Sequence, residues 1–134
     1  MRRAFAKELP ACAELFARVA AETFTWRDPV DMTAASFLED AAWEEVTVAV
    51  EGGALLGLLA LYRPDAFVHS LFVERRGRGV GPELLHHVRD EVDAPLTLKV
   101  ETANIRAVNF YLREGFWPVD RGVDGRGPWI RMSR

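Results

Sequence analysis

The sequence predicts an α+β domain, within the broad α/β class, with a central mixed, mostly antiparallel sheet flanked by helices. The chain opens with two segments whose apolar residues recur every three or four positions, as on the packed face of a helix. Three apolar segments separated by glycine or proline follow, as in antiparallel strands. The third leads into a glycine-rich turn and another helical segment. We expect the order β-α-α-β-β-β-α-β-α-β-β within one domain over residues 1–134.

The N-terminal part of the chain is predicted to be mainly helical. After a very short first strand, apolar spacing predicts a helix over residues 8–22, where Pro10 suits the first turn because its missing N–H is not needed there. Residues 24–32 are expected to form a loop. A second short helix is predicted over Thr33–Ala42, with Thr33 as its N-cap.

Three strands are predicted next, because the apolar residues change from a helical period to runs typical of strands. Val46–Glu51 and Leu55–Tyr62 are joined by Gly52 and Gly53, which tolerate the positive φ angles of a tight hairpin. Ala66–Val73 is nearly continuous in apolar residues, which is typical of a central strand buried on both faces.

The second half of the chain alternates between helix and strand. In chain order we expect a helix over Val80–Glu91, a strand over Leu96–Glu101, a helix over Asn104–Glu114, and strands over residues 116–121 and 129–133. Gly115 suits the left-handed residue that ends a helix. The glycine-rich residues 121–128 are expected to form a loop between the last two strands.

The composition disfavours several classes of protein. Apolar residues make up 49% of the chain and charged residues 28%, as in soluble globular proteins. The single cysteine, Cys12, has no partner for an internal disulfide, and no apolar run approaches the ~20 residues that span a bilayer. A net charge of −3 and a small basic cluster at Arg75, Arg76 and Arg78 suit a small polyanion better than a nucleic-acid duplex. We expect a cytoplasmic protein with no nucleic-acid or membrane partner.

The glycines Gly77, Gly79 and Gly81 alternate between the predicted central strand and the next helix. Glycine allows positive φ and close approach of a ligand, and the first turn of a helix offers unpaired N–H groups. Together they form an anion site suited to phosphate, although a tight connection without a ligand is the alternative. The segment lacks the lysine of a P-loop, and Pro82 stands where a dinucleotide-binding turn needs its third glycine.

Two segments resemble signatures of one enzyme superfamily. Residues 76–81, RGRGVG, resemble the [QR]-x-x-G-x-[GA] signature of the GNAT acyltransferase superfamily. Residues 104–111, NIRAVNFY, followed by Gly115 and Phe116, resemble its N-x-x-A-x-x-F-Y…G-F segment. The expected order of elements also agrees, so the resemblance spans nearly the whole chain.

The resemblance implies a site for acetyl-CoA, and no Cys/His cluster in the sequence suggests a metal. The amides of the glycine turn would bind the pyrophosphate, and the strand preceding it would pair its backbone with the pantetheine arm, as an added strand does. Asn104 would contact the cofactor or fix the helix that follows it. The implied cofactor-binding residues are Leu71, Phe72, Val73, Arg76, Gly77, Arg78, Gly79, Val80, Gly81, Asn104, Asn109 and Tyr111.

Two departures from the family pattern lie beside the glycines. The turn at residues 74–76 is shorter than usual for the family, which would shift the cradle relative to the strand. Pro82 lacks an N–H, so one backbone donor is missing, although proline is tolerated in a first helical turn. We expect binding to survive in weakened form.

The resemblance also implies that Tyr111 acts as general acid near the thioester sulfur. A phenol of pKa ~10 can protonate the thiolate of a thiol of pKa ~8.5 with a small mismatch. For the general base the sequence leaves Glu101 and His69 open, and each has an ordinary structural role as its alternative. His86 and His87 are interpreted as surface residues.

These inferences predict an N-acyltransferase that moves an acetyl group from acetyl-CoA directly to a primary amine acceptor. A non-catalytic acyl-CoA-binding sensor and an interaction domain without a nucleotide are the alternatives. A homodimer through exposed strands is compatible with the sequence. Residues that could wall an acceptor pocket or attract a cationic amine are Phe24, Trp26, Trp43, Trp129, Asp28, Asp31 and Asp65.

Overall fold

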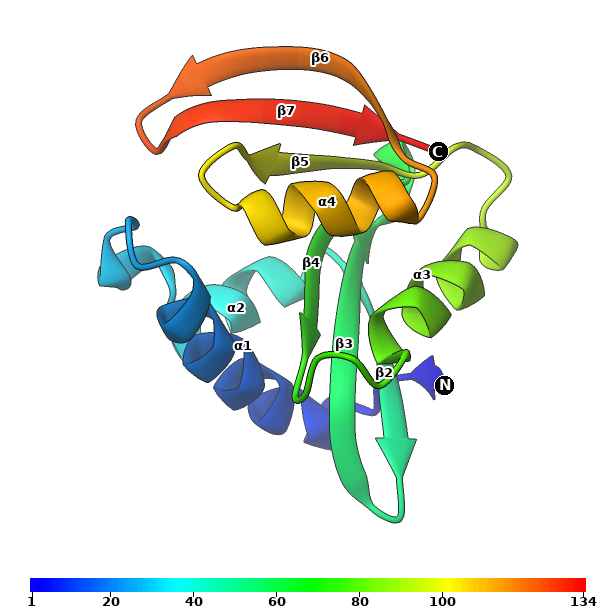
Figure 1. The fold of residues 1–134 in the computed structure, drawn as a ribbon. Helices are drawn as coiled ribbons and strands as arrows, with labels where there is room; N and C mark the ends of the chain where they lie inside the picture. Colours follow the sequence, from blue (N-terminus) through cyan, green and yellow to red (C-terminus); the bar gives the residue numbers. More distant parts are fainter.

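The computed structural model describes residues 1–134, and its elements follow the predicted order (Figure 1). The strands are β1 (Arg2–Arg3), β2 (Glu45–Glu51), β3 (Ala54–Tyr62), β4 (Phe67–Val73), β5 (Thr97–Glu101), β6 (Trp117–Asp124) and β7 (Gly127–Ser133). The helices are α1 (Leu9–Thr23), α2 (Ala34–Ala41), α3 (Val80–Glu91) and α4 (Ile105–Arg113), with short 3-10 turns η1 (Ala6–Glu8), η2 (Pro29–Asp31) and η3 (Arg63–Asp65). None of these helices is both long and apolar enough to cross a membrane.

All seven strands belong to one sheet in the order β1-β2-β3-β4-β5-β7-β6. Only the pair β4 and β5 is parallel, so the predicted mixed, mostly antiparallel sheet flanked by helices is confirmed. Figure 1 shows β5, β7 and β6 running across the direction of β2, β3 and β4. The two halves of the sheet therefore meet at the β4–β5 pair.

The core consists of two apolar clusters that contain side chains from opposite faces of the sheet. The cluster of helices α1 and α2 contains Cys12, Leu15, Phe37, Val48, Leu58 and Phe72. The cluster of helix α3, against which α4 packs, contains Leu84, Val88, Leu59, Leu98, Phe116 and Met132. The helical spacing of the apolar residues in the sequence thus corresponds to burial on one side of each helix.

The two hairpins differ in how well the sequence predicts them. Gly52 and Gly53 have φ of +57° and +80°, as the tight turn between β2 and β3 requires. The strands β6 and β7 extend into residues 121–128, which we expected to be a loop, and Asp124 pairs with Gly127 across the turn. The glycines there indicated a loop because they are weak strand formers, but pairing of the two strands overrides this preference.

Strand β4 is the irregular centre of the sheet. Its register against β3 places Ser70 opposite Ala60 and Val68 opposite Leu61, so the residue between, His69, is left without a partner in a β-bulge. Against β5 only Phe67 and Val68 of β4 are paired. The rest of β4 separates from β5, and its residues alternate between buried and accessible instead of being buried on both faces as predicted.

Candidate active site

The separation of β4 from β5 opens a cavity of about 840 Å³, a size in the usual range for sites that bind small molecules. It is bordered by β4, the turn at residues 74–79, the start of α3, the end of β5 and one side of α4, and on the opposite side by α1 and α2. Every residue that the sequence analysis proposed for catalysis or cofactor binding lines this cavity except Asn109, which is exposed on α4.

The glycine turn has the geometry of an anion cradle. Gly77 and Gly79 both have φ of +76°, and Gly79 is the N-cap of α3 with no side chain capping the helix. The N–H groups of Val80 and Gly81 therefore have no intrahelical acceptor. A Cβ added to Gly81 would lie 3.3 Å from Cζ of Phe110, so this glycine also allows α3 and α4 to approach each other.

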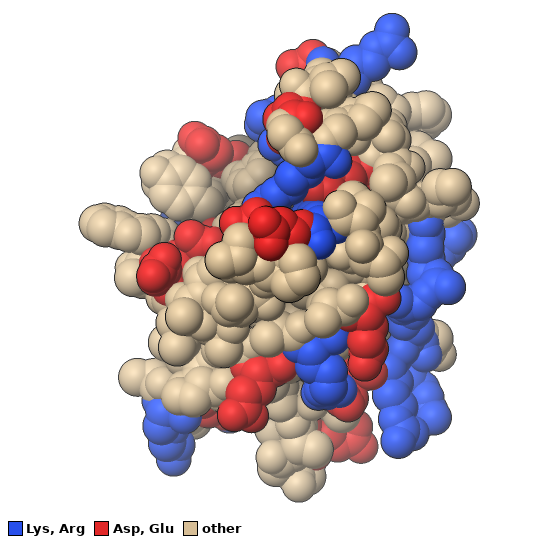
Figure 2. Space-filling view, turned by 90° about the vertical axis from the view of Figure 1, so that its left-hand side faces the viewer, with Lys and Arg blue, Asp and Glu red and all other residues tan.

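Arginines surround the cradle. Arg75, Arg76 and Arg78 of the turn line the cavity together with Arg106 and Arg113 of α4. The last two escaped the sequence analysis, although their spacing of seven residues puts them on one helix face two turns apart. Figure 2 shows Lys and Arg side chains gathered along the right-hand edge of one face of the molecule. This charge distribution favours a ligand that carries several negative charges.

Strand β4 offers its backbone to the cavity. Leu71 and Val73 are partly accessible there, whereas the Phe72 ring packs into the core edge-on to Phe16 at a centroid distance of 5.1 Å. Since no β5 residue pairs with this part of β4, its outward N–H and C=O groups have no strand partner on that side. An extended ligand could take the place of the missing strand.

Tyr111, on α4, also lines the cavity. Its ring packs edge-on against Phe110 and Phe116, at centroid distances of 5.1 and 5.5 Å. Burial raises the pKa of the Tyr111 phenol above its ordinary value, so the hydroxyl keeps its proton over the whole physiological range. Asn104 begins this helix as its N-cap, because Oδ1 accepts a hydrogen bond of 3.3 Å from the Ala107 N–H.

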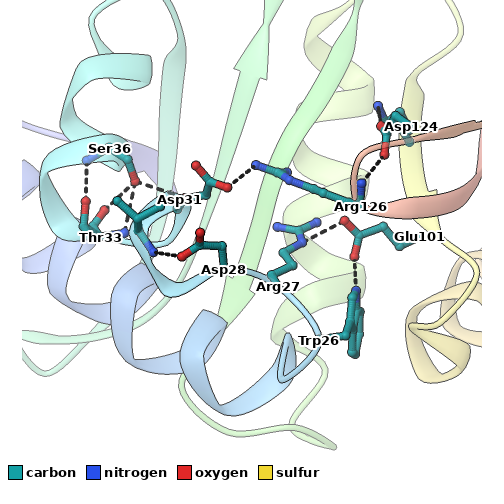
Figure 3. A network of polar contacts seen from close by, with 11 residues as sticks. Trp26, Arg27, Asp28, Asp31, Thr33, Ser36, Glu101, Asp124 and Arg126 are labelled. Atoms are coloured by element: carbon teal, nitrogen blue, oxygen red, sulfur yellow. Dashed lines mark hydrogen bonds and ion pairs between the residues drawn. The ribbon is translucent and has the colours of Figure 1, made fainter.

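Glu101, at the end of β5, is buried and has both carboxylate oxygens engaged (Figure 3). Oε1 forms an ion pair with Nε of Arg27 at 2.8 Å, and Oε2 accepts a hydrogen bond of 2.5 Å from Nε1 of Trp26. Burial lowers the pKa of the Arg27 guanidinium, and the Glu101 carboxylate opposes this effect. Glu101 thus links the loop between α1 and α2 to the sheet, a structural role that is the alternative to the predicted role as a base.

His69 projects from the bulge of β4, and its side chain is 43% exposed. Its Nδ1 lies 2.6 Å from Oε2 of Glu44, a residue between α2 and β2 whose side chain is only 7% exposed. The hydrogen bond to Glu44 raises the pKa of His69, while burial opposes the change. Both residues line the cavity.

Only some of the residues suggested as walls of an acceptor pocket line the cavity. Phe24 and Asp31 line the cavity. Trp43 is 80% exposed and lies outside it, and Asp28 caps the turn η2 by accepting a hydrogen bond from the Val30 N–H. The charged lining residues Arg27, Lys99, Arg126, Asp40 and Glu44 were not proposed from the sequence, because no local pattern marks them.

Comparison with known proteins decides the family. The model of the acetyltransferase (GNAT) domain matches residues 12–133. The chain belongs to the GNAT acetyltransferase family. It is also 30% identical over 131 residues to the peptidyl-lysine N-acetyltransferase YiaC of Escherichia coli K12, covering 90% of this chain and 84% of that protein.

Solved structures with GNAT folds resemble the whole chain. A GCN5-related N-acetyltransferase from Rhodopseudomonas palustris superposes with a TM-score of 0.81 at 16% identity, covering 99% of this chain and 92% of that one. The yncA acetyltransferase of Salmonella typhimurium, solved with its cofactor acetyl-CoA, superposes with a TM-score of 0.71 at 21% identity, covering 99% and 91%. At these identities the likeness concerns the fold.

The residues of this GNAT domain fit an acyl-CoA. The uncapped start of α3 suits a pyrophosphate, the arginines suit further phosphate groups, and the unpaired stretch of β4 suits the amides of a pantetheine chain. Gly77 and Gly79 have space around them, since a Cβ added to either would meet no atom within 4 Å. Glycine is favoured at both positions because of the positive φ of +76°, not because of a lack of space.

Proposed function

We propose that this acetyltransferase moves an acetyl group from acetyl-CoA directly to a primary amine, with Tyr111 as general acid. The observation that carries the proposal is that one cavity is lined by the glycine cradle, by Tyr111 and by the charged side chains Asp31, Asp40 and Glu44. The cradle alone would support a binding protein. A proton donor in the same cavity supports chemistry.

Binding would use the N-terminal end of α3 and the unpaired part of β4. Arg76, Gly77, Arg78, Gly79, Val80 and Gly81 would hold the pyrophosphate, and Leu71, Phe72 and Val73 would hold the pantetheine through their backbone. Acetyl-CoA supplies an activated thioester. Pro82 gives no N–H, so the cradle relies on the amides before it.

The departing sulfur needs a proton, and Tyr111 can supply one. Because burial raises the pKa of the phenol, the proton is present at every working pH. The same shift widens the gap to a thiol of pKa ~8.5, so Tyr111 is a weaker acid than a free tyrosine and depends on close contact with the sulfur. An N–H of β4 would polarise the carbonyl.

The acceptor side of the cavity carries carboxylates. Asp31, Asp40 and Glu44 line it, and they favour the approach of a cationic amine. The curated relative is by name a peptidyl-lysine N-acetyltransferase, so a lysine-containing peptide is the first acceptor to test. Small amines and peptide N-termini complete the panel.

The test has a binding arm and a turnover arm. Calorimetry should detect acetyl-CoA binding, and acetyl-CoA at ~100 times its Kd should stabilise the protein by ~2.7 kcal/mol. CoA release should then depend on an amine. Tyr111→Phe should keep the affinity for acetyl-CoA and lower kcat about 100-fold, as expected for loss of a positioned acid.

Tyr62→Phe is the matched control, since the other tyrosine of the chain ends β3 and lies outside the cavity. Its kinetics should equal those of the wild type. Full turnover of Tyr111→Phe across pH would remove Tyr111 from the mechanism. Binding of acetyl-CoA without turnover of any amine would favour a sensor.

A further inference from the structure

The bulge in β4 presents His69 to the cavity in a defined orientation. A bulge leaves one residue outside the ladder and can redirect its side chain, and His69 is that residue. Its ring lies over the ring of Phe67, with centroids 6.3 Å apart and an interplanar angle of 29°. The backbone and the neighbouring ring thus both restrict the imidazole.

Glu44 orients the ring through a hydrogen bond at Nδ1. It lies 25 residues before His69 in the sequence, and its buried carboxylate accepts from Nδ1 at 2.6 Å. A carboxylate can only accept hydrogen bonds, so in the neutral imidazole the proton sits on Nδ1 and the lone pair on Nε2. Nε2 has no hydrogen-bond partner within the protein.

The charged groups around His69 come from three elements. Glu44 and Asp40 favour the imidazolium from the side of α2, whereas Arg126, in the turn between β6 and β7, disfavours it. Arg126 is itself held near Asp31, with an Nη2 to Oδ2 distance of 3.7 Å (Figure 3). The net environment is one in which a proton on the ring is stabilised by nearby carboxylates.

We infer that His69 is the catalytic base that removes a proton from the acceptor ammonium at Nε2, and that Glu44 is the residue that positions it. The inference deepens the proposed function and rests on it. It also answers the choice between Glu101 and His69, because both oxygens of Glu101 are already engaged by Arg27 and Trp26.

The proton and electron balance is complete without a further reactant. The ammonium of the acceptor gives one proton to Nε2 of His69, and the lone pair that remains on nitrogen attacks the thioester carbonyl carbon. A C–N bond forms and the C–S bond breaks, with its electron pair on sulfur, which takes the proton of Tyr111. The second proton leaves nitrogen and restores the phenol through water, and His69 releases its proton to solvent.

The experiment measures pH profiles of kcat/KM with a lysine peptide for the wild type, Glu44→Gln and His69→Gln. The base must be neutral, so the wild-type rate falls as the pH drops through the raised pKa of His69. In Glu44→Gln this acid limb should move to lower pH, and the plateau should fall about tenfold because the amide can also donate to Nδ1, so that the tautomer with its lone pair on Nε2 is no longer enforced. If the role of Glu44 were purely structural, the acid limb of the kcat/KM profile would stay at the same pH in Glu44→Gln.

His69→Gln should lose about 100-fold at pH 7, with unchanged affinity for acetyl-CoA. The loss should shrink as the pH rises toward the amine pKa of ~10.4, because more acceptor is then already neutral. The NMR titration of His69 gives a readout independent of turnover. Its pKa should be raised in the wild type and fall toward the ordinary value in Glu44→Gln.

A second histidine–glutamate pair provides the control. On α3, Nε2 of His87 lies 2.9 Å from Oε1 of Glu91, outside the cavity. His87→Gln and Glu91→Gln should leave both the profile and the plateau unchanged. This inference alone would be overturned if the wild type were active and either Glu44→Gln kept the wild-type pH profile or His69→Gln kept full activity at pH 7. A wild type that turns over no amine would overturn the proposed function and the base with it.

Discussion

Replacing Arg27 by Gln should detach the loop between α1 and α2 from the end of β5. The guanidinium pairs with Glu101 at 2.8 Å, and the two side chains are only 19% and 6% exposed. The substitution leaves the Glu101 carboxylate buried without its counter-charge. The Trp26 N–H still donates to the other oxygen, so the carboxylate keeps one partner.

The expected cost follows from this geometry. Loss of a hydrogen bond to a charged group costs about 1.5–3 kcal/mol, and removing one partner of a fully buried pair costs about 3–5 kcal/mol. Because some water reaches Arg27 and Trp26 remains bonded, we expect about 2 kcal/mol for Arg27→Gln. For a chain of this length, that lowers Tm by about 6–10 °C.

Arg3→Gln is the matched control. Arg3 also pairs with a glutamate, Glu45, at 2.7 Å, but its side chain is 52% exposed. An exposed pair contributes at most about 1 kcal/mol, so this variant should lose little stability. Both variants are measured by urea unfolding and by Tm, next to Glu101→Gln and the double variant at positions 27 and 101.

The double-mutant cycle should give a coupling of about 1–3 kcal/mol between Arg27 and Glu101. The KM for the amine should rise in each single variant, since the loop borders the cavity. Equal stability losses in Arg27→Gln and Arg3→Gln, or additive effects in the cycle, would refute the proposed fastening of the loop. A fall of about 100-fold in kcat of Glu101→Gln without loss of stability would instead make Glu101 the base.

Three further predictions concern the cradle and the core. Gly79→Ala places a Cβ at φ of +76°, which should cost about 1–2 kcal/mol and weaken acetyl-CoA binding in calorimetry. Gly125 does not have a positive φ, so Gly125→Ala should leave binding unchanged. Burial raises the pKa of the Cys12 thiol to about 11. In the native protein at pH 8, Cys12 should therefore react with Ellman's reagent only as fast as the fold opens locally to expose it. A rapid reaction without denaturant would contradict the buried position. The Phe116 side chain is 1% exposed between the sheet and α4, so Phe116→Ala leaves a cavity and should lower the free energy of unfolding in urea by about 3–5 kcal/mol. A loss below about 1 kcal/mol would show that the residues around Phe116 are not close-packed.

The sequence predicted most elements because their signals are local. The helices α1, α3 and α4 follow from apolar spacing, and the β2–β3 turn follows from two adjacent glycines that tolerate positive φ. The predicted lengths of β6 and β7 were wrong, because the pairing of these strands stabilises glycine-rich residues that are weak strand formers by themselves.

The residues of the candidate site were also predicted only in part. The cradle at residues 76–81 and Tyr111 belong to local motifs, and both line the same cavity. Asn109 belongs to the same motif as Tyr111 but is exposed on α4. The position of a residue around the helix axis decides whether its side chain faces a cavity, and a motif match does not consider this position.

The sequence by itself therefore determined the family, the order of the elements and the glycine cradle at Gly77, Gly79 and Gly81. Only the tertiary structure decided which acidic and basic side chains meet. Glu44 and His69 are 25 residues apart, and Trp26 and Glu101 are 75 apart. No local pattern connects such pairs, since their contact depends on how the bulge in β4 and the separation of β4 from β5 direct side chains from different elements into one cavity.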